Sequence, residues 1–300
     1  MNTFKHMMYW LLFLMLPAAA SQAETQHAAI STEQAKISKP DYAKEQRWAE
    51  QVVDFLIDGE PVWLKADQHK FLGIYTEAVT ETPHGAVILI HGGGVHPDWQ
   101  QVIKPLRTRL PKRGWATLSL QMPVLANRAD EHDYVPLFKF VPARIDAAVK
   151  FLQQQNIKRI VLVGHSLGAA MASNYLATSH NKDINAFVGI GMNGSQQPKV
   201  YLPLDNVASL LQIKVPVLDI YGQYTNEQVL GSRYRRAFAL ESVGNTHSRQ
   251  VFVRKADHFY EGYEQELIDK MYQWMEQTLI PANTADQRKD ETSVQASSMK

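Results

Sequence analysis

A serine lies between two glycines in the stretch Gly-His-Ser-Leu-Gly, residues 164–168 of this 300-residue chain. In a G-x-S-x-G motif, a sharp turn from a strand into a helix holds the serine hydroxyl out, and side chains at the glycine positions would collide. The apolar run RIVLVG before the serine and the small-residue segment SLGAAMASNYLA after it are typical of such a strand and helix. Ser166 is therefore a candidate nucleophile, and the N–H of Leu167 is a candidate oxyanion donor.

A catalytic serine also needs a second oxyanion donor and a base. The stretch His-Gly-Gly-Gly, residues 91–94, follows the apolar run GAVILI, and its glycines let the backbone approach a substrate closely. We expect the N–H of Gly93 to be the second donor, with Gly94 next. His91 and His96 precede the serine in the chain and are expected to be structural. His258 follows the apolar segment RQVFVR and is the candidate base.

These three stretches together resemble the α/β-hydrolase superfamily, from about Pro61 to Leu279, and in particular a little-characterised secreted bacterial branch of it. The resemblance implies an α/β-hydrolase fold, with a mostly parallel central sheet and helices on both faces. It also implies the chain order serine, acid, histidine, which places the base at His258. The connection between about Gly191 and Val215 leaves no room for a large cap domain.

The triad acid is where this sequence departs from the superfamily. Its expected place, three residues after the glycine of VPVLDIYG, is occupied by Thr225, which is not an acid. Glu227 lies two residues further on and is our preferred acid, ahead of Asp219 within the preceding strand. Asn226 is able to orient an imidazole but not to stabilise its charge, and a site without any acid stays open.

The segments around these residues alternate between strand and helix patterns, which indicates a mostly parallel sheet covered on both faces. Strands are expected at residues 61–66, 70–79, 85–90, 115–123, 159–164, 184–191, 215–222 and 249–254. No helical pattern separates the first two, so the sheet should begin antiparallel. Helices are expected around residues 48–56, 145–152, 166–177, 233–240 and 267–275.

The first residues have the order of a secretory signal peptide. Lys5 precedes a short apolar run, and Ser21 and Ala23 occupy the positions expected before a cleavage site. The alternative is an uncleaved membrane anchor. We divide the chain into a signal peptide (1–23), a polar segment with a helix (24–59), an α/β-hydrolase domain (60–280) and a disordered tail (281–300). The mature protein is expected to be periplasmic, or else secreted, without stable membrane insertion.

Composition excludes several other classes of protein. The chain has no cysteine, which excludes disulfides and thiolate metal sites, and its formal net charge of +1 gives no sign of a nucleic-acid partner. The glycine pattern at residues 189–194 lacks the following helix that a dinucleotide site requires. The charged stretch ADEHDY, residues 129–134, is expected to be a solvated loop rather than a metal site.

The sequence thus predicts a serine hydrolase that needs no cofactor or metal and acts on a small ester or other acyl substrate. Apolar residues in the loop after residue 123, such as Leu125 and Phe138, are expected to form an apolar wall beside the serine. Two alternatives stay open. The first is a hydrolase-like binding or scaffold protein whose site has decayed at Thr225, and the second is acyl transfer to an alcohol.

Overall fold

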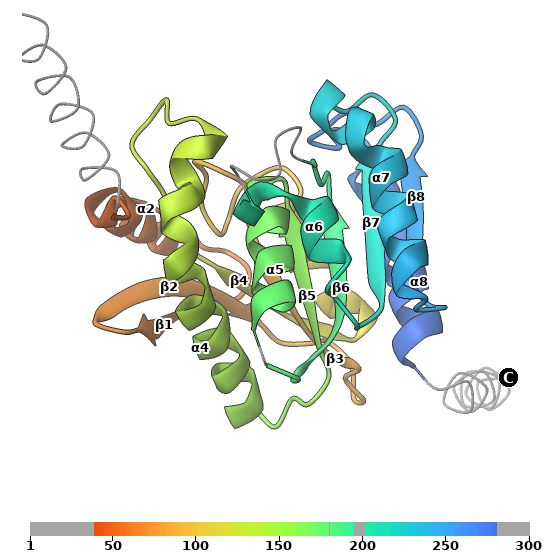
Figure 1. Ribbon diagram of the computed structural model, residues 1–300. Coiled ribbons are helices and arrows are strands. Elements are labelled where there is room, and N and C mark those ends of the chain that lie inside the picture. Colours follow the sequence, from red (N-terminus) through yellow and green to blue (C-terminus); the bar gives the residue numbers. More distant parts are fainter. Residues whose placement is uncertain (1–38, 180, 195–201, 281–300) are drawn as a thin grey trace, which may run out of the picture. The chain divides into compact units, whose positions relative to one another are not determined.

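The described residues build an eight-stranded sheet in the order β1-β2-β4-β3-β5-β6-β7-β8 (Figure 1). The computed structural model describes residues 39–179, 181–194 and 202–280. The expected signal peptide and the tail beyond residue 280 lie outside these residues. The strands are β1 (Glu60–Ala66), β2 (His69–Thr76), β3 (Gly85–Ile90), β4 (Trp115–Leu120), β5 (Ile160–His165), β6 (Ile184–Ile190), β7 (Val217–Gly222) and β8 (Arg249–Val253).

The sheet begins antiparallel and continues parallel, as the sequence predicted. β2 pairs antiparallel with both β1 and β4, and every later pairing, from β4 to β8, is parallel. All side chains of β3, β4 and β5 are buried, because helices cover both faces of the sheet at its centre. The carboxyl ends of β3 and β5 therefore meet at one edge of the sheet, where parallel α/β sheets bind ligands.

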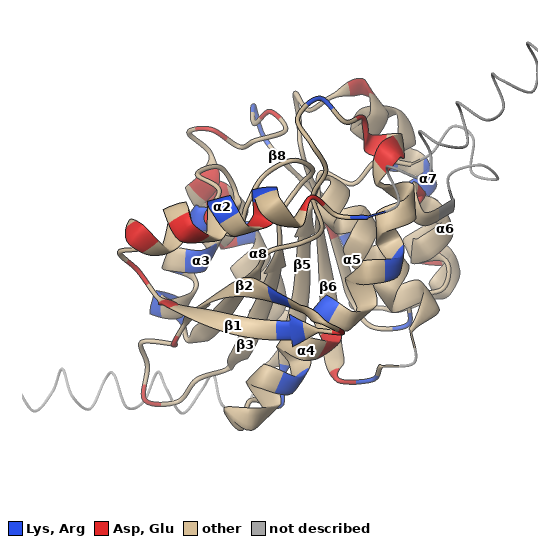
Figure 2. Cartoon of the chain, turned by 90° about the vertical axis from the view of Figure 1, so that its left-hand side faces the viewer, with Lys and Arg blue, Asp and Glu red and all other residues tan. Residues whose placement is uncertain are grey.

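Helices lie on both faces of this sheet. They are α2 (Tyr42–Asp54), α3 (Ile103–Arg109), α4 (Val141–Gln154), α5 (Leu167–Thr178), α6 (Asn206–Leu210), α7 (Glu227–Val243) and α8 (Glu264–Leu279), with short 3₁₀ segments η1 (Pro111–Arg113), η2 (Glu131–Phe140) and η3 (Leu202–Leu204). Figures 1 and 2 show α4, α5 and α6 on one face, and α3 and α8 on the other. Apolar side chains of α3 and α8 share one core cluster with those of β3 and β5.

The N-terminal helix α2 packs on the antiparallel end of the sheet. Its Ala49 and Val52 form a small core with Leu72 and Ile74 of β2. The described residues from Pro40 onward form one compact unit, which includes this helix. Helical spacing in the sequence correctly indicated α2, but Phe55 lies beyond its end and is 82% exposed.

The connection from residue 191 to residue 216 is too short for a cap domain, and its described part holds only η3 and α6. Two other expectations need correction. The charged stretch at residues 129–134 is not a solvated loop, because the 3₁₀ segment η2 begins at Glu131 and half-buries that carboxylate. Helix α7 begins at Glu227, six residues before the predicted start at Arg233.

Candidate functional site

Ser166 occupies the turn between β5 and α5. Its backbone angles are φ 56° and ψ −123°, so this non-glycine residue has a positive φ. Such a conformation is strained and persists only where the surrounding structure enforces it. The strand brings the serine to the carboxyl end of the sheet, and the helix leads away immediately after it. The side chain is half-buried rather than enclosed.

The two flanking glycines are required by close backbone contacts, as the sequence predicted. A Cβ at Gly164 would lie 2.4 Å from the carbonyl oxygen of Gly168. A Cβ at Gly168 would lie 2.3 Å from the carbonyl oxygen of His91, in the loop after β3. Both separations are shorter than any carbon–oxygen contact allows, so only glycine fits. The same contacts hold the serine turn against the glycine loop.

His91 holds the glycine loop at residues 91–94 in place through two hydrogen bonds of its ring. Its Nδ1–H donates to the carbonyl oxygen of Gly92 at 2.8 Å, and its Nε2 accepts from the backbone N–H of Met122 at 2.9 Å. Burial lowers the pKa of His91 to about 3, so the ring stays neutral. Both ring nitrogens have backbone partners, which gives His91 the structural role expected for it.

Gly93 and Leu167 lie next to each other across the turn. A Cβ at Gly93 would come within 3.1 Å of Leu167 Cδ2. Among the described residues, no backbone carbonyl accepts from the N–H of Gly93 or of Leu167. Leu167 is also the first residue of α5, where the helix dipole favours negative charge. Both residues line the same cavity as Ser166, and neither N–H group donates to a backbone carbonyl in the part of the chain that the structure describes.

His258 lies in the loop after β8, directly against the serine turn. The Nε2–H of His165, the residue before the serine, donates to the carbonyl oxygen of His258 at 3.0 Å. The two imidazole centroids are 5.0 Å apart. Gly191, at the end of β6, has φ 63°, and a Cβ there would lie 2.9 Å from His258 Cε1. The glycine motif rejected as a dinucleotide site thus makes room for this imidazole.

The Nδ1 atom of His258 is contacted by Thr225, not by a carboxylate. Thr225 Oγ1 lies 3.0 Å from Nδ1, and Asn226 Nδ2 lies 3.4 Å from it. Asn226 Oδ1 accepts from the backbone N–H of Val229 at 3.0 Å, which directs its NH₂ group toward the imidazole. The threonine at the expected position of the acid therefore replaces it as the hydrogen-bond partner.

The structure does not support Glu227 as the triad acid. Asn226 caps α7, so Glu227 is the first helical residue and its side chain is exposed. No hydrogen bond joins Glu227 to His258 in the part of the chain that the structure describes. The sequence left open whether Glu227 lies in a loop or in a first helical turn; it lies in the first turn of α7, where its side chain is exposed.

Asp219, the alternative acid, is fully buried within β7 and engaged elsewhere. Its Oδ2 accepts from Arg236 Nε and from Gln250 Nε2, both at 2.7 Å. Burial raises the pKa of Asp219, while the Arg236 guanidinium opposes that rise. The carboxylate and guanidinium form a buried ion pair between β7 and α7, which is a structural role.

Within the described residues, Ser166 Oγ and His258 form no hydrogen bond with each other, and His258 Nε2 has no partner. Burial lowers the pKa of the half-buried His258, and the nearby Asp257 carboxylate partly opposes this effect. The imidazole is therefore biased toward its neutral form, the form that can accept a proton.

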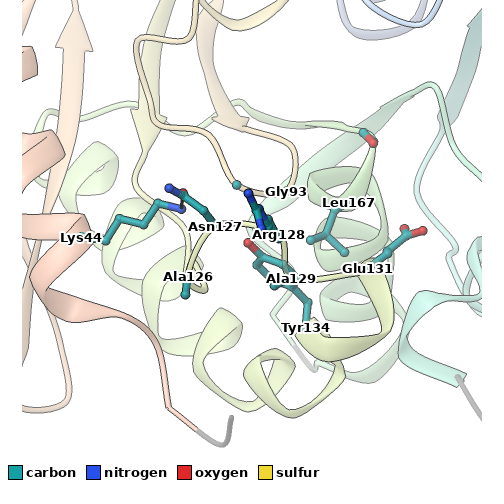
Figure 3. A pocket seen from close by; sticks show the side chains of 11 residues that line it. Lys44, Gly93, Ala126, Asn127, Arg128, Ala129, Glu131, Tyr134 and Leu167 are labelled. Atoms are coloured by element: carbon teal, nitrogen blue, oxygen red, sulfur yellow. Dashed lines mark hydrogen bonds between the residues drawn. The ribbon is translucent and has the colours of Figure 1, made fainter.

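Ser166 opens into a cavity of about 330 Å³ (Figure 3). Its lining consists of Lys44, Gly93, Gly94, Ala126, Asn127, Arg128, Ala129, Glu131, Tyr134, Ser166 and Leu167. The expected apolar wall is absent from this lining, because Val124, Leu125, Leu137 and Phe138 are buried in the core instead. The cavity carries charged and polar side chains, so the preference for small or acyl esters no longer has support from an apolar wall.

Sequence reasoning missed Lys44, Arg128 and Glu131 as cavity residues. Both oxygens of Glu131 accept from Asn193 Nδ2 at 2.9 Å, and burial raises the pKa of Glu131. Lys44 had one signal in the sequence, since it shares a face of α2 with Trp48 and Val52 at intervals of four residues. A lysine on the buried face of a helix indicates a specific environment for its ammonium group.

The described residues contain no group of three or more His, Cys, Asp or Glu side chains placed to hold a metal ion. Among the same residues, no helix has the length and apolar content that crossing a membrane would require. Lysine and arginine residues are interspersed with acidic ones over the face seen in Figure 2.

Solved structures share this fold at low sequence identity. A putative dienelactone hydrolase from Klebsiella pneumoniae matches with a TM-score of 0.60 and 17% identity over 73% of this chain and 97% of that one. The esterase Est1E from Butyrivibrio proteoclasticus matches with a TM-score of 0.57 and 14% identity, over 74% of this chain and 99% of that one. A dienelactone hydrolase from Anabaena variabilis matches with a TM-score of 0.55 and 21% identity, over 73% of this chain and 97% of that one. These matches confirm the predicted α/β-hydrolase fold.

No curated protein matches the chain. A family model does match it, over residues 6–134 and 126–277, and the described part of this region contains α2, both glycine loops and His258. The chain therefore belongs to the family described as "Protein of unknown function (DUF3530)", and it has the α/β-hydrolase fold.

Proposed function

We propose that the protein is a secreted serine hydrolase that cleaves an ester or other acyl substrate through a covalent acyl-enzyme. One observation carries this proposal. The strained turn at Ser166 places its side chain in a cavity that Gly93 and Leu167 also line, with His258 against the same turn. Backbone strain at a residue that lines a cavity is typical of functional sites.

In the proposed mechanism, Ser166 Oγ attacks the substrate carbonyl carbon while His258 Nε2 takes the hydroxyl proton. The N–H groups of Gly93 and Leu167 stabilise the negative oxygen of the tetrahedral intermediate. The intermediate collapses as His258 returns the proton to the leaving alcohol. Water then attacks the acyl carbon while His258 takes one of its protons, and the second tetrahedral intermediate releases the acid as His258 returns that proton to Ser166 Oγ. The Ser166–His258 hydrogen bond forms when substrate binds, since such contacts are often long in free enzymes.

Thr225 has a positioning role in this mechanism. When His258 Nδ1 carries the proton, it donates to Thr225 Oγ1, and Nε2 is left as the base. A hydroxyl orients the ring but brings no negative charge, so the imidazolium formed during attack is less stabilised than it would be beside a carboxylate. We therefore propose a serine–histidine dyad rather than a complete triad.

We also propose that the chain acts in the periplasm after removal of the signal peptide at residues 1–23. The order of a basic residue, an apolar run and small residues at its amino end supports this location. No cofactor or metal is needed for the proposed chemistry.

The alternative is a non-catalytic α/β-hydrolase-like binding protein. Its support comes from the same contacts: Thr225 in place of an acid, and an Asn226 NH₂ group facing His258 Nδ1. If Nδ1 accepted from both neighbours, the proton would reside on Nε2, and the imidazole could not serve as the base. Acyl transfer to an alcohol would use the same groups and would appear as a preference for an alcohol over water.

A fluorophosphonate probe, which labels activated serines, distinguishes these functions. We expect labelling of the folded wild-type protein and none of Ser166→Ala. Ser242→Ala, at an exposed serine of α7, is the matched control and should label like the wild type. Thermal unfolding of all three proteins verifies their folding. A folded wild-type protein that fails to label supports the binding protein instead.

A further inference from the structure

Lys44 reaches the cavity from outside the hydrolase fold. It belongs to α2, which precedes the first strand, yet it lines the same cavity as Ser166. Its side chain is only 6% exposed. A lysine is rarely buried to this extent unless its ammonium group has a specific partner.

All contacts that the described residues make to this ammonium are with neutral groups. Lys44 Nζ donates to the carbonyl oxygen of Leu125 at 2.9 Å and to Asn127 Oδ1 at 3.0 Å. The Trp48 ring lies 4.5 Å from it in a cation–π contact. Within the described residues, no carboxylate lies within ion-pair distance of Nζ, and Asp41 Oδ1 caps the backbone N–H of Lys44. A buried positive charge without a counter-charge is unfavourable.

The neighbouring Glu45 cannot supply that counter-charge, because it is committed to Arg144. Both Glu45 oxygens accept from Arg144 Nη2, at 3.1 and 2.9 Å, and Arg144 Nη1 donates to the carbonyl oxygen of Gln121 at 2.8 Å. This buried pair fastens α2 to α4, and the bond to Gln121 connects Arg144 to the loop that follows β4. The helix therefore holds Lys44 at the cavity and leaves its ammonium group without an ionic partner from this chain's described residues.

Arg128 adds a second positive charge to the cavity, between Lys44 and Glu131. It lines the cavity, its side chain is exposed, and it forms no ion pair in the described part of the chain. Lys44 and Glu131 lie at opposite sides of the view in Figure 3, with Gly93 and Arg128 between them. The Glu131 oxygens are occupied by Asn193. The cavity thus has a basic end and a separate acidic end.

We propose that the substrate of this site carries a carboxylate group, which binds between Lys44 and Arg128 while its acyl carbon lies at Ser166. This inference rests on the proposed serine hydrolase function. A carboxylate is favoured over a phosphate, because the second negative charge of a phosphate would be repelled by Glu131 in a cavity of about 330 Å³. Burial lowers the pKa of Lys44, and the Asp41 carboxylate partly opposes this effect but forms no ion pair with the ammonium group, so the bound carboxylate would supply the ion-pair partner that is absent among the described residues.

Two esters that differ only in this charge test the proposal: 4-nitrophenyl hydrogen glutarate and its neutral methyl ester. We expect wild-type kcat/KM to be about tenfold or more higher for the anionic ester, as one charge-assisted hydrogen bond would give. The ratio should fall by about tenfold in Lys44→Met and by a smaller factor in Arg128→Gln. Lys65→Met, at an exposed lysine of β1, should keep the wild-type ratio.

Binding measurements keep the test independent of turnover. Glutaramate should raise the Tm of the wild-type protein and of Ser166→Ala more than neutral glutaramide does, and Lys44→Met should lose this difference. If Lys44→Met does not fold, the same comparison with Arg128→Gln tests the carboxylate site, because the Arg128 side chain is exposed and its loss should leave the fold intact. Equal kcat/KM for the two esters, or equal Tm shifts with the two amides, would overturn the carboxylate site. Failure to cleave either ester, with selective glutaramate binding intact, would instead count against the hydrolase function alone.

Discussion

Substituting aspartate for Thr225 restores a carboxylate beside His258 Nδ1, and we expect the proposed reaction to become faster. The threonine oxygen lies 3.0 Å from that nitrogen, so a carboxylate there would face the imidazolium directly. Two opposite charges about 4 Å apart interact by about 4 kcal/mol at an effective dielectric constant of about 20. His258 is half-buried and the cavity is open, so we expect about half of that value.

An interaction of about 2 kcal/mol raises the pKa of His258 by about 1.5 units and increases kcat/KM by about thirtyfold above that pKa. In the pH profile of kcat/KM, the wild-type activity should fall on the acidic side (the acidic limb) at a pH below the ordinary histidine pKa of about 6.5, because burial lowers the pKa of His258. In Thr225→Asp the limb should move to higher pH, since a carboxylate favours the imidazolium.

The assay is the pH dependence of kcat/KM with an activated ester, for the wild type, Thr225→Asp and Thr225→Val. The valine variant removes the hydroxyl without adding charge, and we expect it to be slower than the wild type because the imidazole loses its orienting partner. An acidic limb that does not move in Thr225→Asp, in a protein that still unfolds cooperatively, would refute the assignment of Thr225 as the partner of the catalytic base.

Three further predictions follow from the described contacts and from the sequence. Glu227→Gln should change kcat/KM by less than about twofold, since no hydrogen bond links Glu227 to His258 in the described residues, and a strong loss would restore it as the acid. Asp219→Asn should lower the free energy of unfolding by about 3–5 kcal/mol and Tm by roughly 10 °C, because Arg236 stays buried without its counter-ion; an unchanged Tm in thermal unfolding would contradict this. N-terminal sequencing of periplasmic protein should find a start at or near Glu24, and a start at Met1 would mean that the leader is retained.

The strands and the serine turn could be predicted from the sequence because the signals for them are local. The buried strands appear as continuous apolar runs, and β3 and β5 are indeed buried on both faces. A Cβ atom at Gly164 or Gly168 would lie only 2.4 or 2.3 Å from a backbone oxygen, so no other residue fits at either position. Each of these features depends on a segment of about ten residues, so hydrophobic periodicity and glycine spacing were sufficient to predict the strands and the serine turn.

Two helical segments that contain an internal proline were missed, whereas α4, whose proline lies in its first turn, was predicted. α3 contains Pro105 and η2 contains Pro136, and a proline interrupts the pattern by which a helix is recognised. The consequence for the site was substantial, because η2 carries Glu131 into the cavity. The charged stretch at its start has a capping box between Asp130 and Asp133, which is a local signal for the beginning of a helical segment.

Contacts between distant segments could not be predicted. Lys44 lies 122 residues before Ser166, and no local pattern indicates that α2 reaches the cavity. The position of Glu227 relative to His258 is a related case. The sequence shows that an acid is missing at residue 225. The direction of the Glu227 side chain, however, depends on where α7 begins.

The central claim is that Ser166 is an activated nucleophile, and trapping the acyl-enzyme tests it most directly. Mass spectrometry of protein quenched during turnover of 4-nitrophenyl hydrogen glutarate, followed by peptide mapping, locates any acyl group. We predict a glutaryl adduct on Ser166 in the wild type, more of it in Thr225→Val if deacylation is slowed, and none in Ser166→Ala. Ester turnover that persists in folded Ser166→Ala, or an adduct on another residue, would contradict the claim.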